Sequence, residues 1–453
     1  MNEKAGGERA AQMEKIVSTC REVLERDPKN WAAYHDMGVA QMELGRYAEA
    51  AESLERGYGL NRRDIEGLHL AGVAHAEGGD YDTAISKWKA VVKAEPRHAP
   101  SHFFLGKAYA LKGMWDAAIH EFKKSIELRP NATPPLAYTH LAEVYLARAR
   151  LNEAVACLEK AKELAPEDPR VRLNLGAAKL DLGRYEEALS ESQEASRLGA
   201  GSPTAELNAG IALMRLGRHR EAAAAYERAI DLGPDDPEPY LNLGEAHLVM
   251  GDLEGAVAAW QRAVEVSPGY ANAHFNLGVA YFRQNKPDQA AAQWERVLEL
   301  EPRHRRARVG LATLHSQAGK IDEAIEVWQP ILESSKDNPD VLAGLAELYA
   351  RKGDLDAALD YARQSVLSAP GHPTAQLVLG LVLTRRGNTR EGLESLRKAV
   401  ARGDEVLKTK ASTIKACLDE ITLKSLEREA QKSGYSADPA LVKKLGQVRR
   451  AGG

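Results

Sequence analysis

The sequence predicts an all-α solenoid of about eleven 34-residue helix-turn-helix units with helical caps. Three regularities predict it. A small residue returns every 34 residues and is followed twelve positions later by another small residue, a glycine stands between the two helices of most units, and a proline follows most second helices. A single helix pair cannot bury its apolar face, so stacking each pair on the next is expected to form one continuous core.

The small residue at position 8 of each first helix sets the register. Its spacing is 34 residues, except for one spacing of 36 that places a two-residue insertion near Thr133 and Pro134. Position 20, on the second helix, is small as well. The two helices are expected to cross closely there, where a larger side chain would overpack at a cost of about 1–3 kcal/mol. The position-8 residues are Gly38, Gly72, Gly106, Ala142, Gly176, Gly210, Gly244, Gly278, Ala312, Ala346 and Gly380.

The turn and the end of each unit have their own residue types. Glycine accepts the left-handed backbone conformation that ends a helix, and proline cannot continue one. Asn285 replaces the turn glycine once, and Ala149 replaces it once more, so the turn at Ala149 is expected to be strained or differently built. The turn glycines are Gly45, Gly79, Gly113, Gly183, Gly217, Gly251, Gly319, Gly353 and Gly387. The closing prolines are Pro96, Pro130, Pro166, Pro234, Pro268, Pro302 and Pro370.

This 34-residue pattern resembles the tetratricopeptide repeat (TPR), and the resemblance covers about four fifths of the chain. It implies a right-handed superhelical solenoid over residues 31–406. Residues 1–30 are expected to form an N-terminal capping helix, and residues 407–453 C-terminal capping helices with a basic tail. Within these caps, the pattern predicts one helix at 9–27, one long or two short helices at 406–431 and a short basic helix at 438–450.

Composition excludes several classes of function. A net charge of −4 gives no basic field for nucleic acid. No apolar run approaches the ~20 residues that span a bilayer. The N-terminal stretch lacks the apolar core of a secretory signal, and the three cysteines are far apart, so we expect reduced thiols in a cytoplasmic protein.

No phosphate-binding loop, metal motif or nucleophile motif occurs, so we expect no enzyme, no cofactor and no metal. His98 and His102 are four residues apart, but Pro100 intervenes and no third ligand is evident, so a structural role is favoured. Glycosyltransferases that carry such repeats need a separate catalytic domain, and the chain is expected to stop too soon to hold one.

In TPR arrays the inner face is formed by positions 2, 5, 6, 9, 12 and 13 of the first helices. In the central four units this face is apolar and bordered by charged residues. Such an apolar face is explained either by a binding partner or by a role within the protein itself. We take these units as the candidate peptide-binding groove. Its apolar residues are Leu173, Leu207, Ile211, Met214, Leu241, Leu248, Phe275, Val279 and Phe282, and its charged residues include Glu245 and Arg283.

Position 6 of the same units holds an asparagine each time: Asn174, Asn208, Asn242 and Asn276. An amide both donates and accepts, so each could grip the backbone of an extended peptide. Such a row resembles the asparagine ladder in the repeats of O-linked N-acetylglucosamine transferase. The alternative is that these amides bond only within or between repeats.

The sequence thus favours a non-catalytic adaptor that binds an extended or disordered segment of a protein partner in its central groove. At one amide per repeat, the bound segment would be about 10–15 residues long. The other reading is an assembly subunit that binds a folded partner or itself through the edges and caps of the solenoid.

Overall fold

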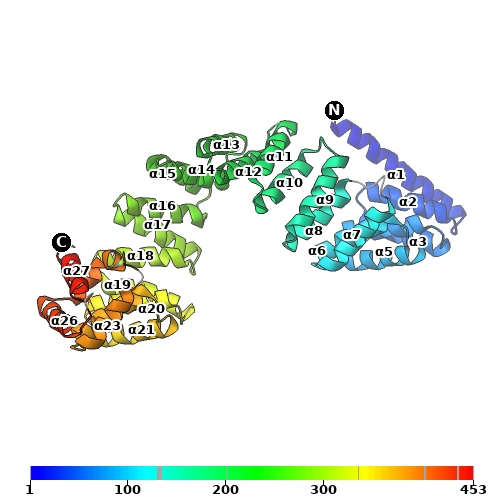
Figure 1. The fold of residues 1–453 in the computed structure, drawn as a ribbon. Coiled ribbons are helices and arrows are strands. Elements are labelled where there is room, and N and C mark those ends of the chain that lie inside the picture. Colours follow the sequence, from blue (N-terminus) through cyan, green and yellow to red (C-terminus); the bar gives the residue numbers. More distant parts are fainter. Residues whose placement is uncertain are drawn as a thin grey trace. The chain divides into compact units, whose positions relative to one another are not determined.

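An α-helical hairpin is the unit from which the structure is built (Figure 1). The computed structural model describes residues 2–129, 135–199, 201–334, 336–401, 403, 405–435 and 438–451. Over these residues there are 27 helices and no strand. The chain forms two units, residues 1–234 and 235–453, which are described one at a time.

The first unit consists of the capping helix α1, Asn2–Arg26, and six hairpins. Within each hairpin the two helices pack on one another, and most second helices also pack on the first helix of the next hairpin. The hairpins are α2 (Trp31–Glu43) with α3 (Tyr47–Leu60), α4 (Ile65–Glu77) with α5 (Tyr81–Ala94), α6 (Ala99–Leu111) with α7 (Trp115–Leu128), α8 (Pro135–Ala147) with α9 (Leu151–Leu164), α10 (Pro169–Asp181) with α11 (Tyr185–Leu198), and α12 (Pro203–Arg215) with α13 (His219–Leu232).

The second unit consists of five hairpins and four terminal helices. The hairpins are α14 (Pro237–Val249) with α15 (Leu253–Val266), α16 (Ala271–Arg283) with α17 (Pro287–Leu300), α18 (Arg305–Gln317) with α19 (Ile321–Ser334), α20 (Pro339–Lys352) with α21 (Leu355–Ser368), and α22 (Pro373–Arg385) with α23 (Thr389–Val400). The terminal helices are α24 (Glu405–Thr409), α25 (Ala411–Cys417), α26 (Glu420–Lys432) and α27 (Asp438–Ala451). The predicted fold class, an all-α solenoid of eleven hairpins with helical caps, is confirmed.

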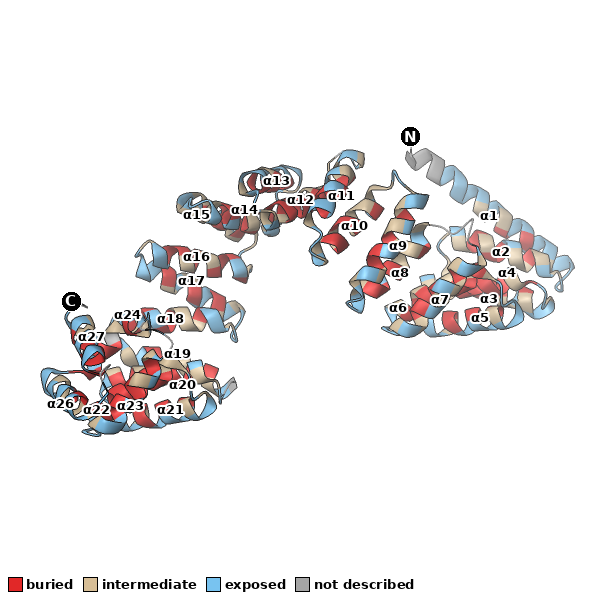
Figure 2. Ribbon diagram, in the orientation of Figure 1, coloured by how far each residue is buried: buried red, intermediate tan, exposed pale blue. Residues whose placement is uncertain are grey.

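Most position-8 glycines make room for a large side chain at position 24 of the second helix. A methyl group at Gly106 would stand 2.8 Å from the ring of Phe122, and one at Gly244 would overlap the indole of Trp260. Both aromatic side chains are fully buried. Figure 2 shows buried residues along the paired helices of each unit. The indole Nε1 of Trp260 also donates to the backbone carbonyl of Leu241, at 3.0 Å, so its one polar atom is satisfied.

All eleven turns between paired helices have a residue in the left-handed conformation. Nine of them are the predicted glycines, and Asn285, at φ 56°, is the tenth. Ala149, at φ 54°, is the eleventh, so this turn is built like the others and is strained, because alanine carries a Cβ.

The closing prolines that the structure describes follow the second helices as predicted, two residues after the last helical residue. Their backbone carbonyls accept side-chain hydrogen bonds that the sequence did not indicate. In five hairpins a side chain at position 4 of the next first helix donates to the carbonyl of the proline six residues earlier. The five pairs are His102 with Pro96, Arg172 with Pro166, His274 with Pro268, Arg308 with Pro302 and Gln376 with Pro370. Pro130 and the insertion near Thr133 and Pro134 lie outside the described residues.

A buried ion cluster ties α9, α10 and α11 together. The ammonium of Lys179, only 3% exposed, lies 2.7 Å from Glu159 and 3.2 Å from Glu191. The Glu191 carboxylate also receives Arg172 at 3.0 Å and Lys162 at 2.8 Å. Each buried charge therefore has an opposite charge beside it, as burial requires.

Candidate functional site

The inner face means here the positions that the repeat pattern predicts to face inward. In the first unit these positions lie partly on α10 and α12, which pack against each other. Leu173 and Asn174 lie on α10 and are half-buried. On α12, Asn208 is 9% exposed, and Ile211 and Met214 are half-buried one and two turns further on. This part of the candidate groove presents two amides among aliphatic side chains.

The inner face of the second unit includes α14 and α16. Asn242 and Leu248 lie on α14, and Asn276 and Val279 on α16, and all four are half-buried. Phe282, on the last turn of α16, is 36% exposed and lies 5.9 Å from the ring of Trp294. Two charged residues complete this part of the groove, Glu245 on α14 and Arg283 on α16, both exposed.

The four asparagine amides share one property. None of them makes a hydrogen bond to another residue of the described part of the chain. A half-buried amide without a protein partner has donors and acceptors left for solvent or a ligand.

The position-5 residues Leu207, Leu241 and Phe275 are less accessible than the sequence indicated, since each is at most 9% exposed. Phe275 shows the reason. The ring of His304 lies 5.0 Å from it, and the guanidinium of Arg306 stands over it at 4.5 Å. Both covering residues come from the start of the next hairpin, so a bound peptide would touch little of Phe275.

At the end of the second unit the inner face is occupied by the chain itself. Glu347 on α20 receives Lys410, at 2.8 Å, and the hydroxyl of Thr413. Arg385 on α22 donates to the carbonyl of Ala416, at 2.8 Å. The segment around α24 and α25 is anchored by buried residues such as Ile414, so it closes this part of the face. Sequence reasoning read the segment only as an end cap.

Beside this segment a cavity of about 340 Å³ remains on the inner face. Ser316, Glu347, Arg351 and Lys410 contribute to its wall. Arg351 donates to the hydroxyl and carbonyl of Ser316, and Lys410 is paired with Glu347. Its charged groups are therefore engaged within the protein.

The titratable groups that could support chemistry are also engaged or buried. Burial raises the pKa of Cys157 and of Cys417 to about 11, so both thiols are protonated at neutral pH. His98 caps α6, and His102 is held between Glu121, at 2.6 Å, and a backbone carbonyl. The described residues contain no group of three possible metal ligands.

None of the described helices combines the length and apolar character that a membrane span requires.

Eleven glycine- or alanine-packed hairpins with left-handed turns make the chain a tetratricopeptide-repeat protein. Residues 4–308, more than half of the chain, match the family described as the Cilia and flagella-associated protein 70 C-terminal domain, and the chain belongs to this family. Residues 282–348 and 344–405 match two families described as tetratricopeptide repeat. A search of curated proteins found no match.

Several solved structures resemble the chain, and some of them are described as tetratricopeptide repeat proteins. A tetratricopeptide repeat protein from Parabacteroides merdae ATCC 43184 is 17% identical, with 56% of this chain and 99% of that chain covered and a TM-score of 0.45. YrrB, described as a TPR protein with an unusual peptide-binding site, is 25% identical, with coverage of 44% and 97% and a TM-score of 0.35. MamA from Desulfovibrio magneticus RS-1 is 25% identical, with coverage of 38% and 96% and a TM-score of 0.35.

Proposed function

We propose that this protein is a non-catalytic adaptor that holds extended segments of a protein partner on the inner faces of its central hairpins. The observation that carries the proposal is the set of four position-6 amides, which have no hydrogen-bonding partner among the described residues. An asparagine that served only to tie repeats together would have such a partner. We include a cytoplasmic location in the proposal, because the three scattered cysteines are free.

The surroundings of the amides support binding of a peptide backbone rather than of a small molecule. In the second unit, Asn242 and Asn276 share α14 and α16 with half-buried Leu248 and Val279 and exposed Phe282. Amides can bond the C=O and N–H of an extended chain, while the aliphatic and aromatic surface accepts its apolar side chains. Because the position-5 residues are largely covered, positions 9 and 12 would supply most of the side-chain preference.

The test is affinity purification from a lysate with the full chain and the Asn208→Ala/Asn242→Ala variant side by side. One amide is removed from each unit. We expect the partner identified with the wild type to be lost from the variant, while the melting temperature stays nearly unchanged, because these amides make no hydrogen bond with the described residues. The partner region should then be narrowed to a synthetic peptide and its affinity measured.

A matched control is Asn152→Ala/Asn388→Ala, which removes one amide from each unit away from the inner face. This control should bind the partner as the wild type does. Unchanged binding by the Asn208→Ala/Asn242→Ala variant would refute the role of the amides. A variant that melts well below the wild type would show that they are structural.

A further inference from the structure

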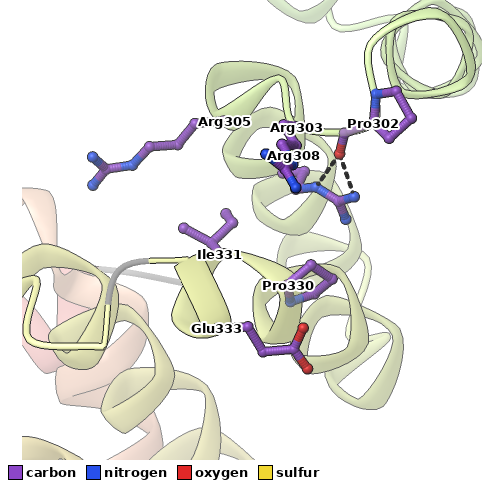
Figure 3. Close-up of a pocket in the computed structure, with 7 residues that line it drawn as sticks. All are labelled: Pro302, Arg303, Arg305, Arg308, Pro330, Ile331 and Glu333. Atoms are coloured by element: carbon purple, nitrogen blue, oxygen red, sulfur yellow. Dashed lines mark hydrogen bonds between the residues drawn. The ribbon is translucent and has the colours of Figure 1, made fainter.

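A cavity of about 560 Å³ lies beside the loop that joins α17 to α18 and the end of α19 (Figure 3). It belongs entirely to the second unit. None of its residues occupies an inner-face position, so the cavity is separate from the candidate groove. Its walls are formed by Pro302, Arg303, Arg305, Arg308, Pro330, Ile331 and Glu333.

The arginines of this cavity have no carboxylate partner among the residues that the structure describes. Arg303 has no hydrogen bond or ion pair with any of these residues. Arg305 donates to the amide oxygen of Asn338, at 3.3 Å, and to no other described residue. Arg308 donates to the Pro302 carbonyl at 3.1 and 2.6 Å, which fixes the rim of the cavity.

Arginines on the neighbouring second helices are different. Arg262 pairs with Glu265, and Arg296 pairs with Glu299 at 2.6 Å. The unpaired arginines therefore form a local positive patch in a chain whose net charge is −4. A guanidinium is weakly hydrated and its fork fits a carboxylate with two parallel bonds, so such a patch favours carboxylates.

The rest of the wall is largely apolar. Ile331 is buried, and Pro302 and Pro330 line the cavity together with it (Figure 3). Pro330 lies inside α19 and supplies no backbone N–H at this point. Among the described residues of the lining, the exposed carboxylate of Glu333 is the one acidic group. A ligand that fits both kinds of surface combines several carboxylates with an apolar side chain.

We propose that this arginine cavity is a docking site for an acidic segment of a partner protein, rich in aspartate and glutamate and carrying an apolar residue. The carboxylates contact Arg303 and Arg305, and the apolar side chain lies against Pro302, Pro330 and Ile331. The site is independent of the inner-face groove, so one partner could engage both through separate segments, which would raise its overall affinity.

The experiment is a fluorescence anisotropy titration of the full chain into a short fluorescein-labelled peptide that is rich in glutamate and carries two leucines. A peptide with lysine in place of glutamate is the probe control. We expect saturable binding of the acidic peptide alone. Arg303→Glu/Arg305→Glu should weaken it at least about tenfold, and raising the ionic strength from about 0.05 to 0.3 M should weaken it several-fold.

The protein control is Arg262→Glu/Arg296→Glu, which makes the same change in total charge at paired arginines outside the cavity. It should bind the acidic peptide as the wild type does, and circular dichroism should show the same helix content for all variants. Absence of saturable binding, or an equal loss in this control, overturns the proposal. So does displacement of the peptide by a single-stranded RNA at lower concentration. If instead the wild type self-associates by light scattering and only Arg303→Glu/Arg305→Glu is monomeric, the patch is a contact between copies and the proposal fails.

Discussion

Ala149 offers a direct test of the backbone argument, because it adopts the conformation of the turn glycines without being one. Its turn is closed as the others are: Ala149 N donates to Leu146 O at 2.9 Å, and Arg150 N to Tyr145 O at 2.8 Å. A left-handed conformation costs an L-residue about 1–2 kcal/mol. Replacing Ala149 by glycine removes this cost. It also raises the conformational entropy of the unfolded chain, which lowers the free energy of unfolding by about 0.4–1 kcal/mol. We therefore expect Ala149→Gly to stabilise the first unit by about 0.5–1 kcal/mol.

The assay is hydrogen exchange by mass spectrometry on the full chain, because a repeat array opens locally before it unfolds. A gain of about 0.5–1 kcal/mol slows exchange of the α8 and α9 amides about two- to fivefold where they exchange through local opening. The matched reversal is Gly217→Ala, since Gly217 has φ 75° and open space around a Cβ, so only the backbone is strained. It should speed exchange in α12 and α13. If Ala149→Gly leaves α8 and α9 unchanged while Gly217→Ala destabilises its hairpin, the reasoning about Ala149 is wrong.

Three further changes test packing and charge. Gly244→Ala should cost about 1–3 kcal/mol, read from the urea midpoint, because its methyl group overlaps Trp260. Burial lowers the pKa of His69 to about 4, although nearby Glu66 acts in the opposite direction. The folded protein therefore loses stability as the pH falls from about 6.5 toward 4, by up to about 3 kcal/mol. Thermal melts of His69→Gln should show a smaller loss over this range, and an equal loss would contradict the assignment. Lys179→Met should lower the free energy of unfolding by about 1–3 kcal/mol in a urea titration. The loss is smaller than for a buried carboxylate left without any cation, because Glu191 keeps Lys162 and Arg172.

The repeat architecture could be predicted from the sequence because it depends on positions that accept few residue types: small residues where the helices cross, and mostly glycine in the turns. The glycine at Gly244 is required by an aromatic ring in the same hairpin, and the turn glycines are required by their own φ values. Both constraints act within one 34-residue unit, so they repeat with its period. Even the departure at Ala149 could be located, although the sequence left open whether strain or a different turn would result.

Side chains that contact the next unit could not be read in the same way. The residue at position 4 that donates to the proline carbonyl is a histidine, an arginine or a glutamine, so no single residue type marks this hydrogen bond. The contact of Lys410 with Glu347 joins residues 63 positions apart and follows from how the C-terminal segment folds back. Neither contact is marked by a residue type that repeats along the sequence.

Access to the inner face depends on both kinds of constraint, those within one repeat and those from the next repeat. At position 5, access is controlled by the residues that begin the next hairpin. His304 and Arg306 cover Phe275, and His98 lies 5.0 Å from the ring of buried His69 in the same relation. The helix pattern of one repeat therefore identifies which residues face inward, but the following repeat decides which of them a partner can reach. Position 6 lies one residue further along the helix, about 100° around it. Three of its asparagines are half-buried and Asn208 is more deeply buried, and none of the four side chains has a hydrogen bond to a described residue. A groove of this kind would bind a partner mainly through its backbone, with selectivity left to positions 9 and 12.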